Sequence, residues 1–170
     1  MDLKLKIVST GGIARALAKA EIYRYLNEPE ETESICRDIL AVEADNQAAL
    51  RMLGLALADP FCGGSSDRCP EAESVFQSLA DPYERLYYTG LLHERKAKAQ
   101  VRAGEPLRIL VPLLENAMAC FEQAEKIRPR DNDDSILRWN RCARLLQSLP
   151  TIQLEKEPVG LDVADGAPVA

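Results

Sequence analysis

From Ile13 onward, apolar residues recur at intervals of three and four along almost the whole chain. This spacing places apolar side chains on one face of an α-helix, because the helix turns once in about 3.6 residues. The same region is rich in Ala, Leu, Glu, Arg and Lys, which favour helices. The pattern therefore predicts an all-α fold.

Proline, glycine and clusters of polar residues divide this pattern into about seven helices. Pro29 and Pro82 stand where a helix can begin, since proline is tolerated in the first helical turn. Pro112 either starts or kinks the sixth helix. The stretch 59–70 has the composition of a loop. We expect helices over about 13–26, 29–43, 47–58, 71–79, 82–103, 107–128 and 133–148.

A pattern of side-chain sizes repeats from helix to helix. The even-numbered helices carry apolar or small residues at intervals of four and three: Thr32, Cys36 and Ile39; Ala72, Phe76 and Leu79; Ala117, Phe121 and Ala124. The odd-numbered helices place a small residue at the centre of the same spacing: Ala16, Ala20 and Tyr23; Leu50, Gly54 and Leu57; Leu86, Gly90 and His93; Trp139, Ala143 and Leu146. Ala20 and Gly54 are 34 residues apart, and Gly54 and Gly90 are 36 apart.

This period, with Gly or Ala in mid-helix and an Ala-Phe-Ala pattern before a Pro in the partner helix, resembles the tetratricopeptide repeat family. The resemblance covers Ile13 to about Leu149. It implies a right-handed superhelical solenoid of antiparallel helix pairs, with about three repeats and the seventh helix as a cap. Because two helices approach closely only where one offers a small side chain, we expect Gly54 and Gly90 to face Ala72 and Ala117.

The chain divides into three regions on this interpretation. Residues 1–12 form an N-terminal segment, and residues 13–149 form the helical array. Residues 150–170 are rich in Pro, Gly, Val and acids. Such a composition buries too little apolar surface to offset the entropy of ordering, so we expect a disordered acidic tail.

In this family the first helix of each pair lines a concave groove that holds a peptide or a partner helix. The matching positions here are Ala14, Leu17, Glu21, Arg24, Ala48, Arg51, Leu55, Ala58, Glu84, Tyr87, Leu91 and Glu94. Helical spacing independently places each set on one face of its helix. The residues that we expect to bind the partner are Leu17, Glu21, Arg24, Arg51, Leu55, Tyr87, Leu91 and Glu94.

The composition of this lining bears on the partner. The family's carboxylate clamp, which grips a peptide C-terminus with Lys, Arg and Asn, is absent, because the matching residues include Leu17, Glu21 and Glu84. An apolar strip of Leu17, Leu55, Tyr87 and Leu91 suits an amphipathic helix or an apolar peptide. The resemblance implies a non-enzymatic adaptor or scaffold that binds a protein or peptide and needs no cofactor. The alternative is a structural protein that self-associates as a homo-oligomer.

Charge and hydropathy indicate the protein's location and exclude some classes of partner. The net charge of the 170 residues is −6, of which residues 151–170 contribute −3. An acidic body does not suit a protein that binds nucleic-acid phosphates. The N-terminus lacks the apolar core of a secretory signal, and the longest apolar run, residues 109–114, is too short to cross a membrane. These features predict a cytoplasmic protein that binds neither nucleic acid nor membrane.

Few side chains suggest chemistry. His93 is the only histidine and takes a place where other helices carry Tyr23 or Leu57, so we expect it to pack between helices. Three interpretations are open for Cys62 and Cys69: free thiols, which we favour, a disulfide, or half of a zinc site that lacks its other two ligands. Cys36, Cys120 and Cys142 fit the core as small apolar residues.

Two polar stretches are further candidates for binding an anionic group. Residues 9–12 (STGG) lack the preceding strand and the Lys of a phosphate-binding loop, so Ser9 or Thr10 is expected to be a helix N-cap. Residues 93–102 contain Arg95, Lys96, Lys98 and Arg102. We interpret this basic run mostly as a solvated helix face, and it is the best candidate surface for an anionic partner.

Overall fold

A computed structural model describes residues 3–59 and 68–156 of the chain, with side chains described as far as Leu149. Seven α-helices and no strand occupy these residues, which confirms the expected all-α class and number of helices. The helices are α1 (Ile13–Tyr25), α2 (Pro29–Leu40), α3 (Gln47–Leu57), α4 (Cys69–Gln77), α5 (Pro82–Ala103), α6 (Leu107–Lys126) and α7 (Asp134–Lys156), and a short 3₁₀ turn, η1 (Thr10–Gly12), precedes α1.

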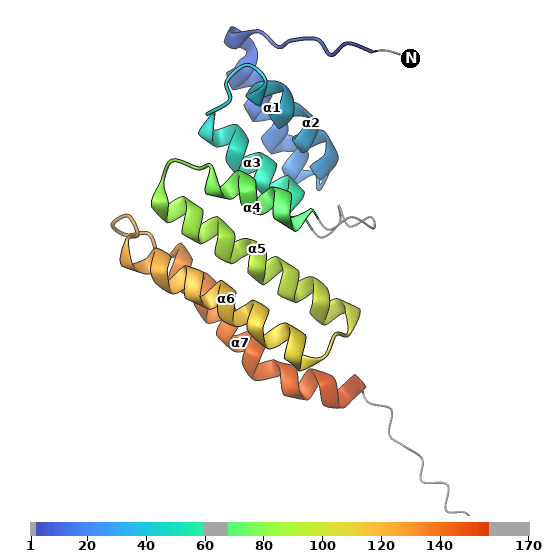
Figure 1. The fold of residues 1–170 in the computed structure, drawn as a ribbon, viewed down its shortest axis with the longest axis vertical. Coiled ribbons are helices and arrows are strands. Elements are labelled where there is room, and N and C mark those ends of the chain that lie inside the picture. Colours follow the sequence, from blue (N-terminus) through green and yellow to red (C-terminus); the bar gives the residue numbers. More distant parts are fainter. Residues whose placement is uncertain (1–2, 60–67, 157–170) are drawn as a thin grey trace, which may run out of the picture.

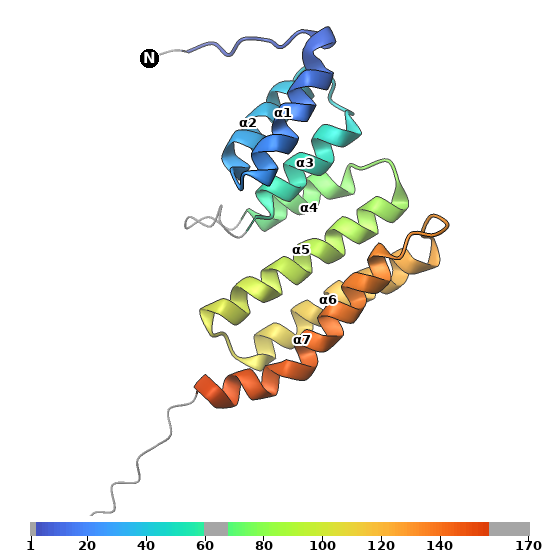
Figure 2. The same ribbon diagram turned by 180° about the vertical axis from the view of Figure 1, so that it is seen from behind.

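The helices form a stack in which each one packs against the next along the chain. Helix α1 also contacts α3, and α5 also contacts α7. Figures 1 and 2 show the consequence: the layers follow one another along the long axis, with α1 and α2 at one end and α6 and α7 at the other. None of the helices in residues 3–59 and 68–156 combines the length and apolar composition that a membrane crossing requires.

Local chemistry explains several helix ends. The Asn46 side chain accepts a hydrogen bond from the Ala49 N–H at 3.0 Å and so caps α3. Asp81 accepts from the Tyr83 N–H at 2.9 Å and caps α5. Gly104 ends α5 in the left-handed conformation, with φ of 80°, which glycine adopts without a steric penalty.

The structure departs from several of the expected local features. Helix α2 ends at Leu40, several residues before the expected turn, and α4 begins at Cys69, inside the stretch expected to be a loop. Of the two roles expected for Pro112, starting the sixth helix is excluded, because Pro112 lies within α6. Ser9 precedes η1 without a hydrogen bond from its side chain, so it does not act as a side-chain cap.

The largest difference concerns the end of the array. Helix α7 continues through Pro150 to Lys156, whereas we expected it to end at Ser148 and a disordered tail to follow from residue 150. The boundary is therefore wrong by several residues. Residues 157–170 lie outside the described part of the chain, as does Cys62.

Two phenylalanines pack against the two mid-helix glycines. A Cβ atom added to Gly54 would lie within 2.7 Å of three atoms of the Phe76 ring, and one added to Gly90 would lie 2.8 Å from Cε1 of Phe121. Both rings are fully buried. We expected Ala72 and Ala117 to be the nearest neighbours of the glycines. The nearest atoms instead belong to the aromatic residue one turn further along the partner helix.

The first helix pair uses a smaller version of the same arrangement. Ala20 stands in the place of the glycines, and Cys36 stands in the place of the phenylalanines; both are fully buried. The buried Thr32 hydroxyl donates to the Ala20 carbonyl at 3.1 Å, so the hydroxyl is satisfied where the two helices approach. A larger residue at the crossing is thus matched by a smaller one opposite, as close packing requires.

Aromatic rings continue from one helix pair to the next. The Phe76 ring of α4 stacks on Tyr88 of α5, with ring centroids 5.2 Å apart. Tyr88 meets Tyr87 edge-on at 5.2 Å, and Tyr87 meets Phe121 of α6 at 5.9 Å. These four rings form an aromatic chain from α4 through α5 to α6, and pairs at such distances add to the burial energy.

A charged network joins the outer faces of α2 and α4. Arg68 donates two hydrogen bonds to the Glu33 carboxylate at 2.6 and 2.7 Å, and Arg37 bonds to both Glu33 and Glu71. The hydrogen bonds from Arg68 lower the pKa of Glu33, and those from Arg37 lower the pKa of Glu71. The network therefore stabilises the fold where both carboxylates are ionised.

The Gly54–Phe76 contact predicts the effect of a single methyl group. Gly54→Ala should lower stability by about 2 kcal/mol, because overpacking outweighs the ~1 kcal/mol that Ala gains in a helix. Phe76 is fully buried and stacked on Tyr88, so the ring cannot swing aside. Gly90→Leu should cost more than this. Urea unfolding would measure both effects.

Gly11→Ala is the matched control, because no atom lies within 4 Å of a Cβ added there. It should leave the unfolding midpoint unchanged. Equal stability of the Gly54→Ala and Gly11→Ala variants would contradict a close crossing of α3 and α4.

The network between α2 and α4 predicts a pH dependence. A lowered folded-state pKa gives stability that is present above the ordinary value of 4.5 and is lost as the pH falls through the folded value. The wild type should therefore exceed Glu33→Gln in unfolding free energy at neutral pH, and the difference should shrink below pH 4.5. Urea unfolding at several pH values would show this. Glu115→Gln, at an exposed position on α6, should show no such difference.

Candidate partner-binding groove

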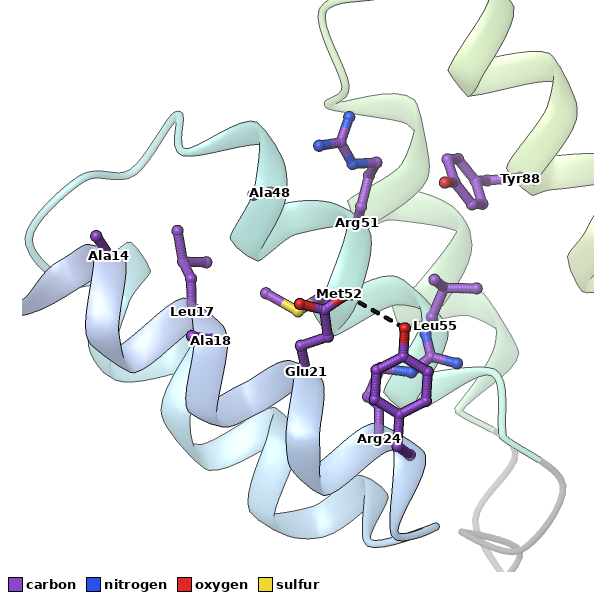
Figure 3. A pocket seen from close by; sticks show the side chains of 11 residues that line it. Ala14, Leu17, Ala18, Glu21, Arg24, Ala48, Arg51, Met52, Leu55 and Tyr88 are labelled. Atoms are coloured by element: carbon purple, nitrogen blue, oxygen red, sulfur yellow. Dashed lines mark hydrogen bonds between the residues drawn. The ribbon is translucent and has the colours of Figure 1, made fainter. Parts of the chain in front are cut away.

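A pocket of about 650 Å³ lies where α1, α3 and α5 meet (Figure 3). We call it the α1–α3 pocket, since only Tyr88 comes from α5. Its lining consists of Ala14, Leu17, Ala18, Glu21, Arg24, Tyr25, Ala48, Arg51, Met52, Leu55 and Tyr88. The pocket is large enough for several side chains of a bound segment.

The lining is mixed in character. Its apolar part comes from Leu17, Met52, Leu55 and Tyr88, all of which are only half-buried in the free chain. Charged side chains stand beside it, and on α1 the Tyr25 hydroxyl donates to Glu21 at 3.5 Å. Half-buried apolar groups next to charged ones are the composition found where one protein binds another.

An ion pair between α3 and α5 helps to shape the pocket. Arg51 donates to the Glu84 carboxylate at 2.5 Å, with both side chains partly exposed. A partly exposed pair of this kind contributes little to stability. Its effect is to hold the Arg51 guanidinium between α3 and α5, so this cation is only partly available to a partner.

The structure brings together five of the eight residues expected to bind a partner. Leu17, Glu21 and Arg24 of α1 and Arg51 and Leu55 of α3 all line the α1–α3 pocket. The expected groove residues Ala14 and Ala48 line it as well. Ala58 is buried and does not.

The three residues expected from α5 lie elsewhere. Leu91 is 5% exposed and packs in a cluster with Cys142 and Leu145 of α7. Glu94 is fully buried. Tyr87 is half-buried within the aromatic chain. The expectation that Leu91 and Glu94 line an open groove is therefore wrong, because α7 packs over this face of α5.

Several lining residues were not expected. Ala18, Tyr25, Met52 and Tyr88 each lie one residue from an expected position, so the lining covers a wider face than the one we inferred. Half-buried Met and Tyr side chains are typical of adaptable binding surfaces. For Tyr25, Met52 and Tyr88 the residue type was the only signal in the sequence, and no signal pointed to Ala18.

Glu94 is the most unusual charged group in the described chain. Its carboxylate is fully buried, forms an ion pair with Lys98 one turn later, and lies 3.6 Å from Arg138 of α7. One of its oxygens has no hydrogen-bond partner. Tyr87 and the Glu94 carboxylate both stabilise the Arg138 guanidinium, and they raise its pKa although burial opposes this. Glu94 thus fastens α7 to α5 through charge.

The basic run in residues 93–102 is less solvated than expected. Arg95 is half-buried and donates to the Leu55 carbonyl of α3 at 3.0 Å, near the negative end of that helix. Burial lowers the pKa of Arg95, with a further contribution from Arg24. Only Arg102 of this run is exposed to the extent expected of a solvated face.

The histidine and the described core cysteines considered for chemistry are buried or half-buried in the helix packing. His93 is half-buried, and burial lowers its pKa. Cys36 and Cys142 are buried, and burial raises the pKa of each thiol to about 12. Among the described residues, no group of three His, Cys, Asp or Glu side chains could hold a metal ion. The three interpretations of Cys62 and Cys69 stay predictions, because Cys62 lies outside the described residues.

The buried Glu94 predicts a strong dependence on Lys98. Lys98→Met should destabilise the fold by about 3 kcal/mol, because it leaves a buried carboxylate with Arg138 as its nearest cation. The double variant Glu94→Leu/Lys98→Met should recover most of this loss, since the fully buried carboxylate is then gone and Arg138, which is only half-buried, keeps its contact with Tyr87. Urea unfolding of the wild type, the single variant and the double variant would measure it. A single variant as stable as the wild type would contradict the ion pair.

Comparison of the whole chain with known protein families, with curated proteins and with solved structures finds no match.

Proposed function

We propose that this protein is a non-enzymatic interaction module, an adaptor or scaffold, which binds a peptide or a partner helix in the α1–α3 pocket. It is a member of a helical-repeat class whose helix pairs form a right-handed solenoid of the tetratricopeptide type. The repeated size pattern, with Gly or Ala opposite Phe or Cys at each crossing, supports this arrangement.

The observation that carries the proposal is the state of the pocket in the free chain. Leu17, Met52 and Leu55 are apolar, yet each keeps part of its surface exposed at one shared cavity of about 650 Å³. Burying such surface against a partner is favourable, at about 25 cal/mol for each Å² removed from water. The side chains come from two helices that the Gly–Phe and Ala–Cys crossings hold in place, so the site is largely formed before binding.

A second candidate role is self-association of the array. Its support is the N-terminal segment, in which Leu3, Leu5 and Ile7 are 75%, 87% and 87% exposed. Apolar side chains grouped in this way are a surface that another copy could cover. Light scattering at several concentrations separates the two roles, because a mass that stays monomeric favours the adaptor.

Filling the pocket should abolish binding without harming the fold. Ala18 is exposed and lines the pocket, so Ala18→Trp adds bulk there without overpacking the core. We expect its melting temperature to stay within about 2 °C of the wild type. Proteins captured by the wild type and identified by mass spectrometry should be lost, and calorimetry with the purified partner should show no heat of binding.

Ala119→Trp is the matched control, because Ala119 is an exposed alanine on α6 that lies outside the pocket. This variant should bind as the wild type does. Capture that survives Ala18→Trp would place the binding surface elsewhere on the array.

A further inference from the structure

Cations gather along one path from the α1–α3 pocket across α5 to α7. This cationic strip consists of Arg24 of α1, Arg95, Lys98 and Arg102 of α5, and Arg138 and Arg141 of α7. Arg24 lines the pocket at one end of the strip. The charges of Arg24 and Arg138 both act on Arg95, so the three guanidinium groups are neighbours although they come from three helices.

The other end of the strip is a second cavity, of about 290 Å³, between α5 and α7. Lys98, Val101, Arg102, Arg141 and Leu145 line it. Three of these five residues are cationic and two are apolar. The cavity therefore offers positive charge beside an apolar surface, as the first pocket does.

The strip is not neutralised by the carboxylates around it. Glu21, Asp59 and Glu94 lie beside it in the described residues, and Glu94 is fully buried and paired with Lys98. Glu84, near the pocket, is paired with Arg51. Six cations against three carboxylates give this path a positive charge, while the whole chain carries −6. Within the described part of the chain, none of the ion pairs involves Arg24, Arg102 or Arg141.

We propose that the partner segment is acidic: an amphipathic helix whose apolar side chains enter the α1–α3 pocket and whose carboxylates lie along the cationic strip. This inference rests on the proposed function and specifies the chemistry of its partner. Guanidinium groups bind carboxylates through paired hydrogen bonds. A positive path on an otherwise acidic protein also attracts an acidic segment to this face and repels basic ones.

A peptide fits these observations better than a nucleic acid does. The net charge of −6 repels a long polyanion, which would extend beyond the strip onto acidic surface. The pocket at the end of the strip is lined by Leu17, Met52 and Leu55, which suit leucine-like side chains. A phosphate backbone has no group for such a pocket.

The test uses three fluorescein-labelled peptides of about 20 residues, long enough for a stable amphipathic helix. All carry Leu at the same helical spacing, and they differ only in having Glu, Gln or Lys at the polar positions. In fluorescence anisotropy with the full chain, the Glu peptide should bind at least about tenfold more tightly than the Gln peptide. The Lys peptide should bind least. Raising the salt from about 50 to 500 mM should remove the preference for Glu.

Variants of the chain make the test specific to the strip. Arg102→Glu/Arg141→Glu changes two exposed residues, so its melting curve should stay close to that of the wild type. Its affinity for the Glu peptide should fall about tenfold or more, and its affinity for the Lys peptide should rise. Arg108→Glu/Arg130→Glu makes the same change of charge at exposed positions outside both cavities, and should retain the wild-type order.

Four results would overturn the inference. Equal binding of the Glu and Gln peptides would refute an acidic partner and leave the proposed groove intact. Failure of all three peptides to bind would also refute it, while the Ala18→Trp experiment judges the groove separately. Tighter binding of a thymidine oligonucleotide would point to nucleic acid. In a last experiment, the acids of the C-terminal segment are removed in the variant Glu157→Gln/Asp162→Asn/Asp165→Asn. If this variant binds the Glu peptide tenfold more tightly than the wild type does, the chain's own C-terminal segment is the occupant.

Discussion

The contact between an aromatic ring and a glycine sets how closely these helices approach one another. Phe76 lies against Gly54 and Phe121 lies against Gly90, and in each case even a methyl group on the glycine would collide with the ring. In the first helix pair, Ala20 and Cys36 take these places, and the Cys side chain, which is smaller than Phe, leaves room for the Ala methyl group. A change of volume at these crossings should affect the neighbouring layers too, since close-packed interiors transmit small changes in volume.

The spacing of the layers divides the proposed binding surface into two parts. At α1 and α3 the faces remain open, and Leu17, Met52 and Leu55 keep exposed surface in the pocket. At α5 the equivalent face is covered by α7, which buries Leu91 and leaves cations along the junction of the two helices. One end of the surface therefore provides mainly shape and apolar contact, and the other provides mainly charge.

The sequence predicted the elements well and the site only in part. Helix type and most boundaries follow from periodicity and from local signals such as Asn46 and Asp81, which act within one turn. The end of α7 was missed, because Pro150 suggested a stop and the helix passes through it. For the site, periodicity shows which residues share a face but not what covers it. Glu94 illustrates this limit, because a charged residue at a groove position proved to be buried by a helix more than 30 residues later in the chain.

The aromatic chain from Phe76 through Tyr88 and Tyr87 to Phe121 has a consequence for the order of unfolding. It links the second helix pair to the third with centroid distances of 5.2 to 5.9 Å, and it includes no residue of α1 or α2. In a stack where layers contact mainly their neighbours, cooperativity depends on such links between layers. Amide hydrogens of α3 to α6 should therefore exchange together as one unit, whereas α1 and α2 fray earlier. The α1 side of the binding pocket would then open more often than the α5 side, although both sides are formed in the folded chain.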